Sequence, residues 1–172
     1  MSGLVAAVRS YSQLDRASLR RIELTEGLDS TLVMLAHRIG DGVTVRRDYD
    51  PAVPEVEAFA GELNQVWTHL IDNAITAMEG TGTLRVSTRL GDDGVVVEIG
   101  NTGPEMPAEV RAHAFEPFFT TKPVGSGTGL GLDVSRRIVV ERHGGDIAIE
   151  SRPGETVLVV RLPFRLPAAA GR

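Results

Sequence analysis

Apolar residues recur every three or four positions in four stretches of the chain, and this period predicts amphipathic helices. The predicted helices span residues 4–18, 29–37, 61–78 and 129–143. We expect Asp29 or Ser30 to cap the second helix, and Gly144 to follow the end of the fourth. The third helix has the clearest apolar stripe, formed by Leu63, Val66, Trp67, Leu70, Ile71, Ala74 and Met78. This stripe is expected to face the core.

Short alternating or β-branched runs between these helices predict strands. They span residues 43–49, 56–60, 83–90, 95–99, 147–151 and 156–162. Turn sequences at 91–94 and 153–154 join the last four strands into two hairpins. A short helix at 107–113, a loop at 115–126 and a frayed tail from Pro163 complete the prediction. Because the strands arrive in pairs, we expect an α+β fold whose mixed, mostly antiparallel sheet is packed on one face by helices.

The composition is that of one globular domain. The 172 residues are 42% hydrophobic and 24% charged, and the net charge of −5 disfavours a general nucleic-acid binder. The lack of cysteine excludes disulfides and cysteine metal sites and fits a reducing compartment. No apolar run approaches the roughly 20 residues of a membrane span, and Leu4 to Val8 is too short for a signal peptide. We therefore expect a cytoplasmic domain without direct membrane contact, which leaves open a membrane-attached full-length protein.

Glycine occupies every second position just before and at the start of the fourth predicted helix, in Gly125-Ser126-Gly127-Thr128-Gly129-Leu130-Gly131-Leu132. Alternate glycines leave backbone N–H groups uncrowded, and a helix start adds unpaired donors and a positive dipole end. The run therefore predicts a phosphate cradle. Its spacing differs from the dinucleotide pattern G-x-G-x-x-G, and Leu132 stands where a P-loop has lysine.

A polar stripe runs along another side of the third helix and consists of Gln65, His69, Asn73 and Thr76. Alone, such a stripe is usually solvated surface. Beside a phosphate cradle, Asn73 has a second interpretation, because its amide oxygen can ligate a hard cation such as Mg²⁺. An uncharged ligand adds no repulsion next to a triphosphate.

Four motifs together resemble those of the ATP-binding domain of bacterial sensor histidine kinases. They are an asparagine box at 65–74, a first glycine box at 101–107, a phenylalanine box at 115–122 and a second glycine box at 125–132. The wider group is the GHKL superfamily, shared with DNA gyrase, the ninety-kilodalton heat-shock chaperone and mismatch-repair ATPases. The resemblance implies the Bergerat fold, a two-layer α/β sandwich that holds ATP between the long helix and a mobile lid.

The resemblance also implies a role for each matching residue. Asn73 would coordinate Mg²⁺, and Asn101 and Gly103 would meet the adenine of ATP. The phosphates would be contacted by Gly127, Thr128, Gly129, Leu130 and Gly131. The lid would carry Phe115, Phe118, Phe119 and Lys122. Ordinary core packing of the aromatic residues and a solvated loop lysine at position 122 stay open as alternatives.

Two positions depart from the family pattern. Asn101 stands where the family usually has an aspartate that accepts a hydrogen bond from the adenine amino group. A charged hydrogen bond is worth about 1.5–3 kcal/mol against about 0.5–1.5 kcal/mol for a neutral one, so weaker ATP binding is predicted. His69 stands where the family usually has asparagine. It is either a tolerated replacement or a catalytic-site group that ligates metal, touches phosphate or acts as a base.

The same positions bear on the reaction. Hydrolysing relatives place a glutamate at the position of His69 to activate water, and Asp72 points about 100° away from Asn73 on a helix. Phosphoryl transfer is therefore favoured over efficient hydrolysis. In sensor kinases an acidic residue follows the acceptor histidine, and no such residue follows His37, His69, His113 or His143. The acceptor is expected on a separate helical domain, upstream or in trans.

Residues 4–18 resemble the end of the second helix of that histidine-bearing hairpin. We therefore expect a hairpin remnant at 1–20, the ATP-binding catalytic domain at 21–165 and a disordered tail at 166–172. The expected partners are the histidine-bearing domain, a response regulator and a second copy through residues 4–18. Two other functions stay open. They are an anti-sigma-type serine protein kinase of the same fold and a non-catalytic, nucleotide-gated interaction module.

Overall fold

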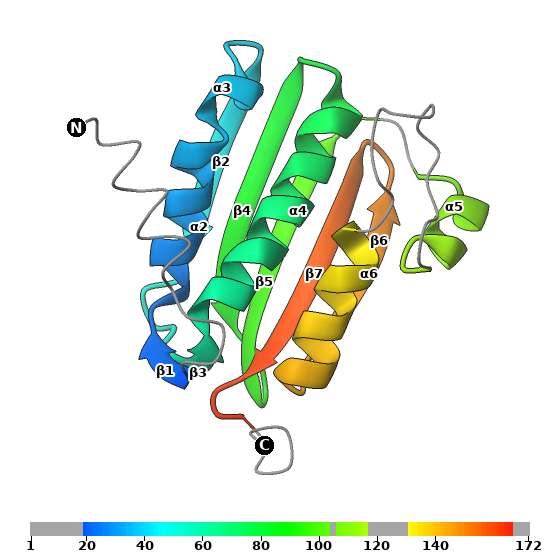
Figure 1. The fold of residues 1–172 in the computed structure, drawn as a ribbon. Helices are drawn as coiled ribbons and strands as arrows, with labels where there is room; N and C mark the ends of the chain where they lie inside the picture. Colours follow the sequence, from blue (N-terminus) through cyan, green and yellow to red (C-terminus); the bar gives the residue numbers. More distant parts are fainter. Residues whose placement is uncertain (1–18, 104–105, 117–130, 167–172) are drawn as a thin grey trace.

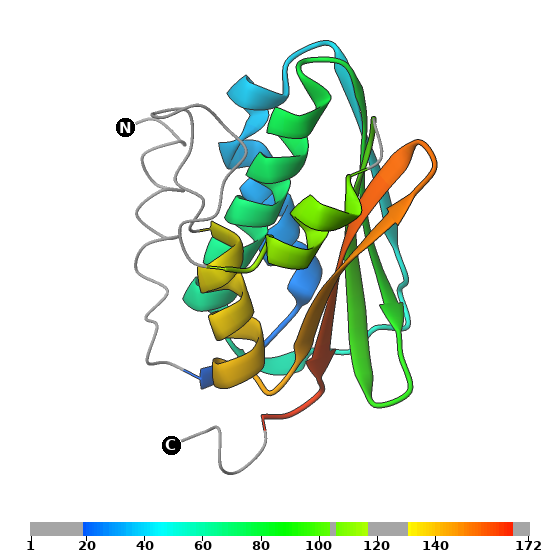
Figure 2. The ribbon, with the colours of Figure 1, turned by 90° about the vertical axis from the view of Figure 1, so that its right-hand side faces the viewer.

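The fold is a two-layer sandwich, seen here in a computed structural model that describes residues 19–103, 106–116 and 131–166. The strands are β1 (Leu19–Ile22), β2 (Val43–Tyr49), β3 (Val56–Phe59), β4 (Gly82–Leu90), β5 (Gly94–Thr102), β6 (Asp146–Arg152) and β7 (Glu155–Pro163). The α-helices are α2 (Leu24–Met34), α3 (Ala36–Ile39), α4 (Ala60–Met78), α5 (Ala108–His113) and α6 (Gly131–Arg136). The π-helix η1 (Arg137–Arg142) continues α6. Figures 1 and 2 show the helices gathered on one face of the main sheet.

The main sheet has five strands in the order β2-β4-β5-β7-β6. Three of its four pairings are antiparallel, and only β2 and β4 run parallel. Both predicted hairpins are present, and Gly91 N–H closes the first by donating to Gly94 O over 2.7 Å. β1 and β3 form a separate antiparallel pair. The expected α+β class and the mostly antiparallel sheet are confirmed.

The core lies between the main sheet and the helices α2 and α4. The apolar stripe predicted for α4 is buried there, with Trp67 at 1% and Leu70 at 0% exposure. In β5, Val95, Val97 and Ile99 belong to this core, whereas Val96 belongs to a second cluster with residues of β7. Because side chains alternate along a strand, the odd-numbered positions of β5 face the helices.

The opposite face of the sheet carries a network of ion pairs. Arg85 of β4 contacts Glu98 of β5 at 3.2 Å and Glu155 of β7 at 3.4 Å. The second contact crosses β5 at Gly100, where a Cβ atom would lie 3.0 Å from a Glu155 carboxylate oxygen. This face is separated from the helices by the sheet (Figure 2).

The start of α2 differs from the sequence prediction. The helix begins at Leu24, and Glu23 at its N-cap makes no side-chain capping bond. Asp29 is therefore not a cap. It accepts hydrogen bonds from Arg47 Nε at 3.0 Å and Tyr49 Oη at 2.8 Å, which tie α2 to β2. Burial and this bond raise the pKa of Tyr49 well above its ordinary value. In the described part of the chain, no helix has the length and apolarity to cross a membrane.

Candidate functional site

Asn73 and His69 lie on successive turns of α4, and both are half-buried. Their neighbour Asp72 is held on the side of α3. There it forms an ion pair with Arg38, whose Nη2 also donates to Thr76 Oγ1 over 3.2 Å. The Asp72 carboxylate is thus bound to a guanidinium, as expected for a side chain turned away from Asn73.

The helix formed by α6 and η1 runs antiparallel to α4 and packs against it. At one end, Arg142 of η1 contacts Glu62 near the start of α4 at 2.9 Å. Asn73 follows Glu62 by eleven residues, and Gly131 precedes Arg142 by eleven. At about 1.5 Å of rise per residue, the first described turn of α6 falls within roughly one turn of the level of Asn73.

The end of β5 contributes Asn101 and Gly103. Asn101 is 6% exposed and lies on the helix-facing side of its strand, and its Nδ2 donates to Thr102 O over 3.2 Å. The side-chain amide oxygen of Asn101 can therefore accept a hydrogen bond from a ligand. Gly103 has a φ of +138° and donates its N–H to Gly154 O over 3.1 Å. Among the described residues, no atom would lie within 4 Å of a Cβ at Gly103, so this part of the chain leaves its backbone uncovered.

The polypeptide around α5 is attached to the rest of the fold at both of its described ends. Met106 N–H donates to Ser151 Oγ of β6 over 2.9 Å. Phe115 is partly buried and packs against the main core, which is the packing interpretation kept open for this aromatic residue. The other predicted lid and phosphate residues lie outside the described ranges: Phe118, Phe119, Lys122, Gly127, Thr128, Gly129 and Leu130. Their roles stay predictions.

These groups fit a bound nucleotide with a hard cation. They supply a neutral oxygen ligand at Asn73, a neutral hydrogen-bond acceptor at Asn101, an open backbone at Gly103 and the described start of α6. Among the described residues, no cluster of three His, Cys, Asp or Glu side chains is placed to hold a metal ion without other ligands. Asn73 suits Mg²⁺ beside a triphosphate, because its amide oxygen is a hard, uncharged ligand.

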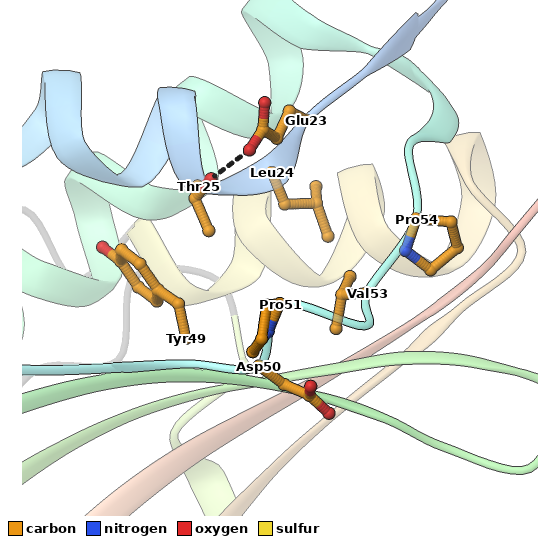
Figure 3. Close-up of a pocket in the computed structure, with 8 residues that line it drawn as sticks. All are labelled: Glu23, Leu24, Thr25, Tyr49, Asp50, Pro51, Val53 and Pro54. Carbon is orange, nitrogen blue, oxygen red and sulfur yellow. Dashed lines mark hydrogen bonds between the residues drawn. The ribbon is translucent and has the colours of Figure 1, made fainter.

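A different hollow of about 240 Å³ lies between the start of α2 and the connection from β2 to β3. Figure 3 shows Tyr49, Leu24 and Val53 on its walls, with Glu23 and Asp50 at its rim. None of the eight residues lining it is Lys, Arg or His. Two carboxylates without a cation would repel a triphosphate, so this hollow does not suit a nucleotide.

Sequence reasoning missed a cluster at the far end of the helix pair, formed by Phe59, Glu62, Arg142 and His143. His143 is 2% exposed, and its Nε2 accepts a hydrogen bond from Phe59 N–H over 3.1 Å. Burial lowers the pKa of His143, and Glu62 and Arg142 act on it in opposite directions. Hydrogen bonding to Glu62 raises the pKa of Arg142. Contacts between residues 80 or more positions apart leave no local signal in a sequence.

Comparison with known proteins identifies the family. Residues 60–166 match the model of the family described as histidine kinase-, DNA gyrase B-, and HSP90-like ATPases. The chain belongs to this family. The matched region contains α4 with Asn73, the end of β5 with Asn101 and Gly103, and the second glycine box. The resemblance predicted from the four motifs is confirmed.

Similar proteins are sensor kinases. The sensory histidine kinase/phosphatase NtrB of Rhodobacter capsulatus is 31% identical over 173 residues, which cover 93% of this chain and 48% of the relative. Sensor kinase CckA of Brucella abortus is 33% identical over 178 residues, which cover 94% of this chain and 19% of the relative. The chain thus spans half or less of the length of these two relatives.

Solved structures extend the likeness to the fold. The catalytic domain of histidine kinase ThkA has a TM-score of 0.79 at 31% identity, covering 86% of this chain and 97% of that domain. Histidine kinase ThkA in complex with response regulator protein TrrA has a TM-score of 0.74 at 27% identity, covering 94% of this chain and 46% of the kinase. The chain is therefore an ATP-binding domain of the sensor histidine kinase type.

Proposed function

We propose that this domain binds Mg-ATP between α4 and α6 and transfers the γ-phosphate to a histidine on a separate helical domain. One observation supports this most directly. Asn73 is half-buried on α4, and the start of α6 falls roughly at its level. A neutral oxygen ligand and a helix start close to one another suit a magnesium-bound triphosphate.

The nucleotide contacts follow the motifs. Asn101 accepts a hydrogen bond from the adenine amino group, and the open backbone at Gly103 admits the ring. Asn73 ligates Mg²⁺, which neutralises phosphate charge when it is bound. The amides of residues 127–131 hold the phosphates, and Phe119 and Lys122 cover them, while Phe115 anchors the start of this segment on the core. Excluding water strengthens the charge contacts inside such a site.

The reaction is transfer rather than hydrolysis. The bond between the γ-phosphorus and the β–γ bridging oxygen breaks, a new bond forms to an imidazole nitrogen of the acceptor, and ADP leaves. Hydrolysis would need a carboxylate beside Asn73 to activate water. Asp72 is the adjacent carboxylate and is paired with Arg38. The site therefore supplies position and electrostatic stabilisation, and the acceptor supplies the nucleophile.

The longer protein would provide the other parts. We assign residues 1–20 to the end of the histidine hairpin, 21–165 to the catalytic domain and 166–172 to a tail. β1 spans the first of these boundaries, because Leu19 already pairs with Phe59 of β3. A response regulator then receives the phosphoryl group from the histidine, and residues 4–18 join two copies. The domain acts in the cytoplasm, also when the longer protein is attached to a membrane.

The test is to incubate the domain with γ-labelled Mg-ATP and a separately produced histidine-hairpin fragment. Acid-labile label on the histidine supports the proposal, and its loss in Asn73→Ala assigns the transfer to this site. Label on serine would instead favour the serine kinase. The substitutions at Asn101 and His69 favour a second candidate, a non-catalytic module gated by nucleotide. Mg-ATP binding without any transfer would support that function.

A further inference from the structure

Directional contacts join Phe59, Glu62, Arg142 and His143, and we call this cluster the helix clasp. Arg142 donates from Nε to Glu62 Oε1 at 2.9 Å and from Nη2 to Glu62 Oε2 at 3.0 Å. The same guanidinium lies 4.3 Å from the centre of the Phe59 ring. His143 joins the cluster through its bond from Phe59 N–H and an edge-on contact with the Phe59 ring at 5.6 Å.

His143 can satisfy these contacts in one protonation state. Its Nε2 must be an acceptor, because Phe59 N–H donates to it. Its Nδ1 lies 2.9 Å from Ile138 O and must therefore carry the proton. The neutral ring thus closes the last turn of η1 and binds the residue just before α4. Each ring nitrogen thus makes a hydrogen bond to the backbone of a different element: Nε2 to Phe59 of β3 and Nδ1 to Ile138 of η1.

The clasp lies at one end of the two helices that border the proposed nucleotide site at their other ends. Glu62 is in the first turn of α4, eleven residues before Asn73, and Arg142 is the last residue of η1, eleven after Gly131. Because a helix transmits an axial shift along its length, the axial offset fixed at the clasp also fixes the offset between Asn73 and Gly131.

Stability alone is a weak explanation for such a cluster. A partly buried ion pair gains little over apolar side chains of similar volume, whereas buried polar contacts are best known for fixing a register. Hydrogen bonds have a narrow preferred geometry, so a bidentate guanidinium and a ring held at both nitrogen atoms add a specific axial offset to the apolar packing of the two helices.

We propose that the helix clasp is a positioning device: without touching the nucleotide, His143, Glu62 and Arg142 set the axial register of α4 and α6 and thereby control the affinity for Mg-ATP. This inference rests on the proposed nucleotide site. It assigns a role in binding to residues at the opposite end of that site's two helices.

The test compares Mg-ATP dissociation constants of folded variants by calorimetry, well below their melting transitions. His143→Leu removes both hydrogen bonds and is expected to weaken binding about tenfold, within the usual range for coupled sites. His143→Gln keeps an acceptor near the Nε2 position and is expected to restore affinity to within about threefold of the unchanged domain. Glu62→Gln weakens the bidentate pair and is expected to fall between the two.

The matched control is Arg85→Gln, which breaks ion pairs on the opposite face of the sheet. Its affinity is expected to equal that of the unchanged domain even if its stability falls. Equal affinity in His143→Leu, or a loss in Arg85→Gln as large as in His143→Leu, would overturn the role of the clasp. Failure of the unchanged domain to bind Mg-ATP would instead overturn the nucleotide site itself, and with it the inference.

Discussion

At the scale of single residues, Asn101 is the position where this domain departs most clearly in charge from the motif it otherwise matches. It lies at the end of β5, 6% exposed, on the face that the helices cover. An amide there can accept a hydrogen bond but brings no charge, and it costs little to bury when no nucleotide is bound. A carboxylate would bind the adenine amino group more strongly and would be harder to bury in the empty site.

We therefore expect Asn101→Asp to bind ATP about five- to tenfold more tightly, because a charged hydrogen bond exceeds a neutral one by about 1 kcal/mol. The same variant is expected to be less stable without nucleotide. Calorimetry with Mg-ATP and urea unfolding of the empty domain measure both effects. Asn101→Ala, which has no acceptor, is the control and should bind more weakly. If Asn101→Ala bound ATP more tightly than Asn101→Asp, residue 101 would not be the group that accepts a hydrogen bond from the adenine.

At the scale of elements, α2 and α4 approach each other closely at Gly27. A Cβ atom at Gly27 would lie 2.5 Å from Asn64 Oδ1 and 3.5 Å from the ring of Trp67, and both side chains are buried. A glycine inside a helix costs about 1 kcal/mol in helix propensity relative to alanine. A Cβ atom here would displace the buried amide of Asn64, and we expect this displacement to outweigh the gain in helix propensity.

Gly27→Ala is accordingly expected to lower the free energy of unfolding by about 1–3 kcal/mol, since overpacking exceeds the propensity gain. Ser30→Ala, at an exposed position of the same helix, should change it by about 0.5 kcal/mol or less. Urea unfolding curves of the two variants give the comparison. Stabilisation by alanine at position 27 would contradict the close approach.

How well an element could be predicted depended on whether its determinants are local. α4 was predicted to within one residue at its start because nineteen residues repeat one period. β5 was predicted to end at Ile99 and continues to Thr102, because its pairing with β7 extends it. β1 was missed, since four residues with two arginines show no alternation and the strand exists through β3. The start of α2 was predicted too late in the sequence, because no capping side chain marks the true start of this helix.

At the scale of the whole molecule, the parts that could not be predicted are contacts between distant segments. The parallel pairing of β2 with β4 has no signature in either strand. The same distinction applies to the functional residues. The motifs predicted Asn73, Asn101, Gly103 and Gly131 as site residues, whereas nothing in the sequence predicted the helix clasp. Its contacts join β3 and the start of α4 to the end of η1, and only the folded chain brings them together.

The clasp makes the stability of the whole domain depend on pH. The folded-state pKa of His143 is lowered by burial, with Glu62 opposing and Arg142 reinforcing the shift. Well above pH 6.5, the pKa of histidine in the unfolded chain, His143 is neutral in both states and contributes no pH dependence. Below it, the unfolded chain binds a proton that the folded domain resists, so stability falls as the pH falls.

Below about pH 6.5 the free energy of unfolding is therefore expected to fall with pH, with a limiting slope of about 1.36 kcal/mol per pH unit. Urea unfolding at a series of pH values measures it. The control is His143→Gln, in which every other titrating group is unchanged and this part of the loss should vanish. Identical pH profiles for the two proteins would show that His143 does not titrate as its burial requires.

The central claim is that Asn73 and the amides of residues 127–131 bind one magnesium-bound nucleotide. The most direct measurement is an amide NMR titration of the domain with Mg²⁺ and a non-hydrolysable ATP analogue. We predict shifts gathered at Asn73, Asn101, Gly103 and residues 127–131, with the shift at Asn73 lost when Mg²⁺ is withheld. Shifts confined to the hollow beside Tyr49, or no shifts at saturating nucleotide, would contradict the account.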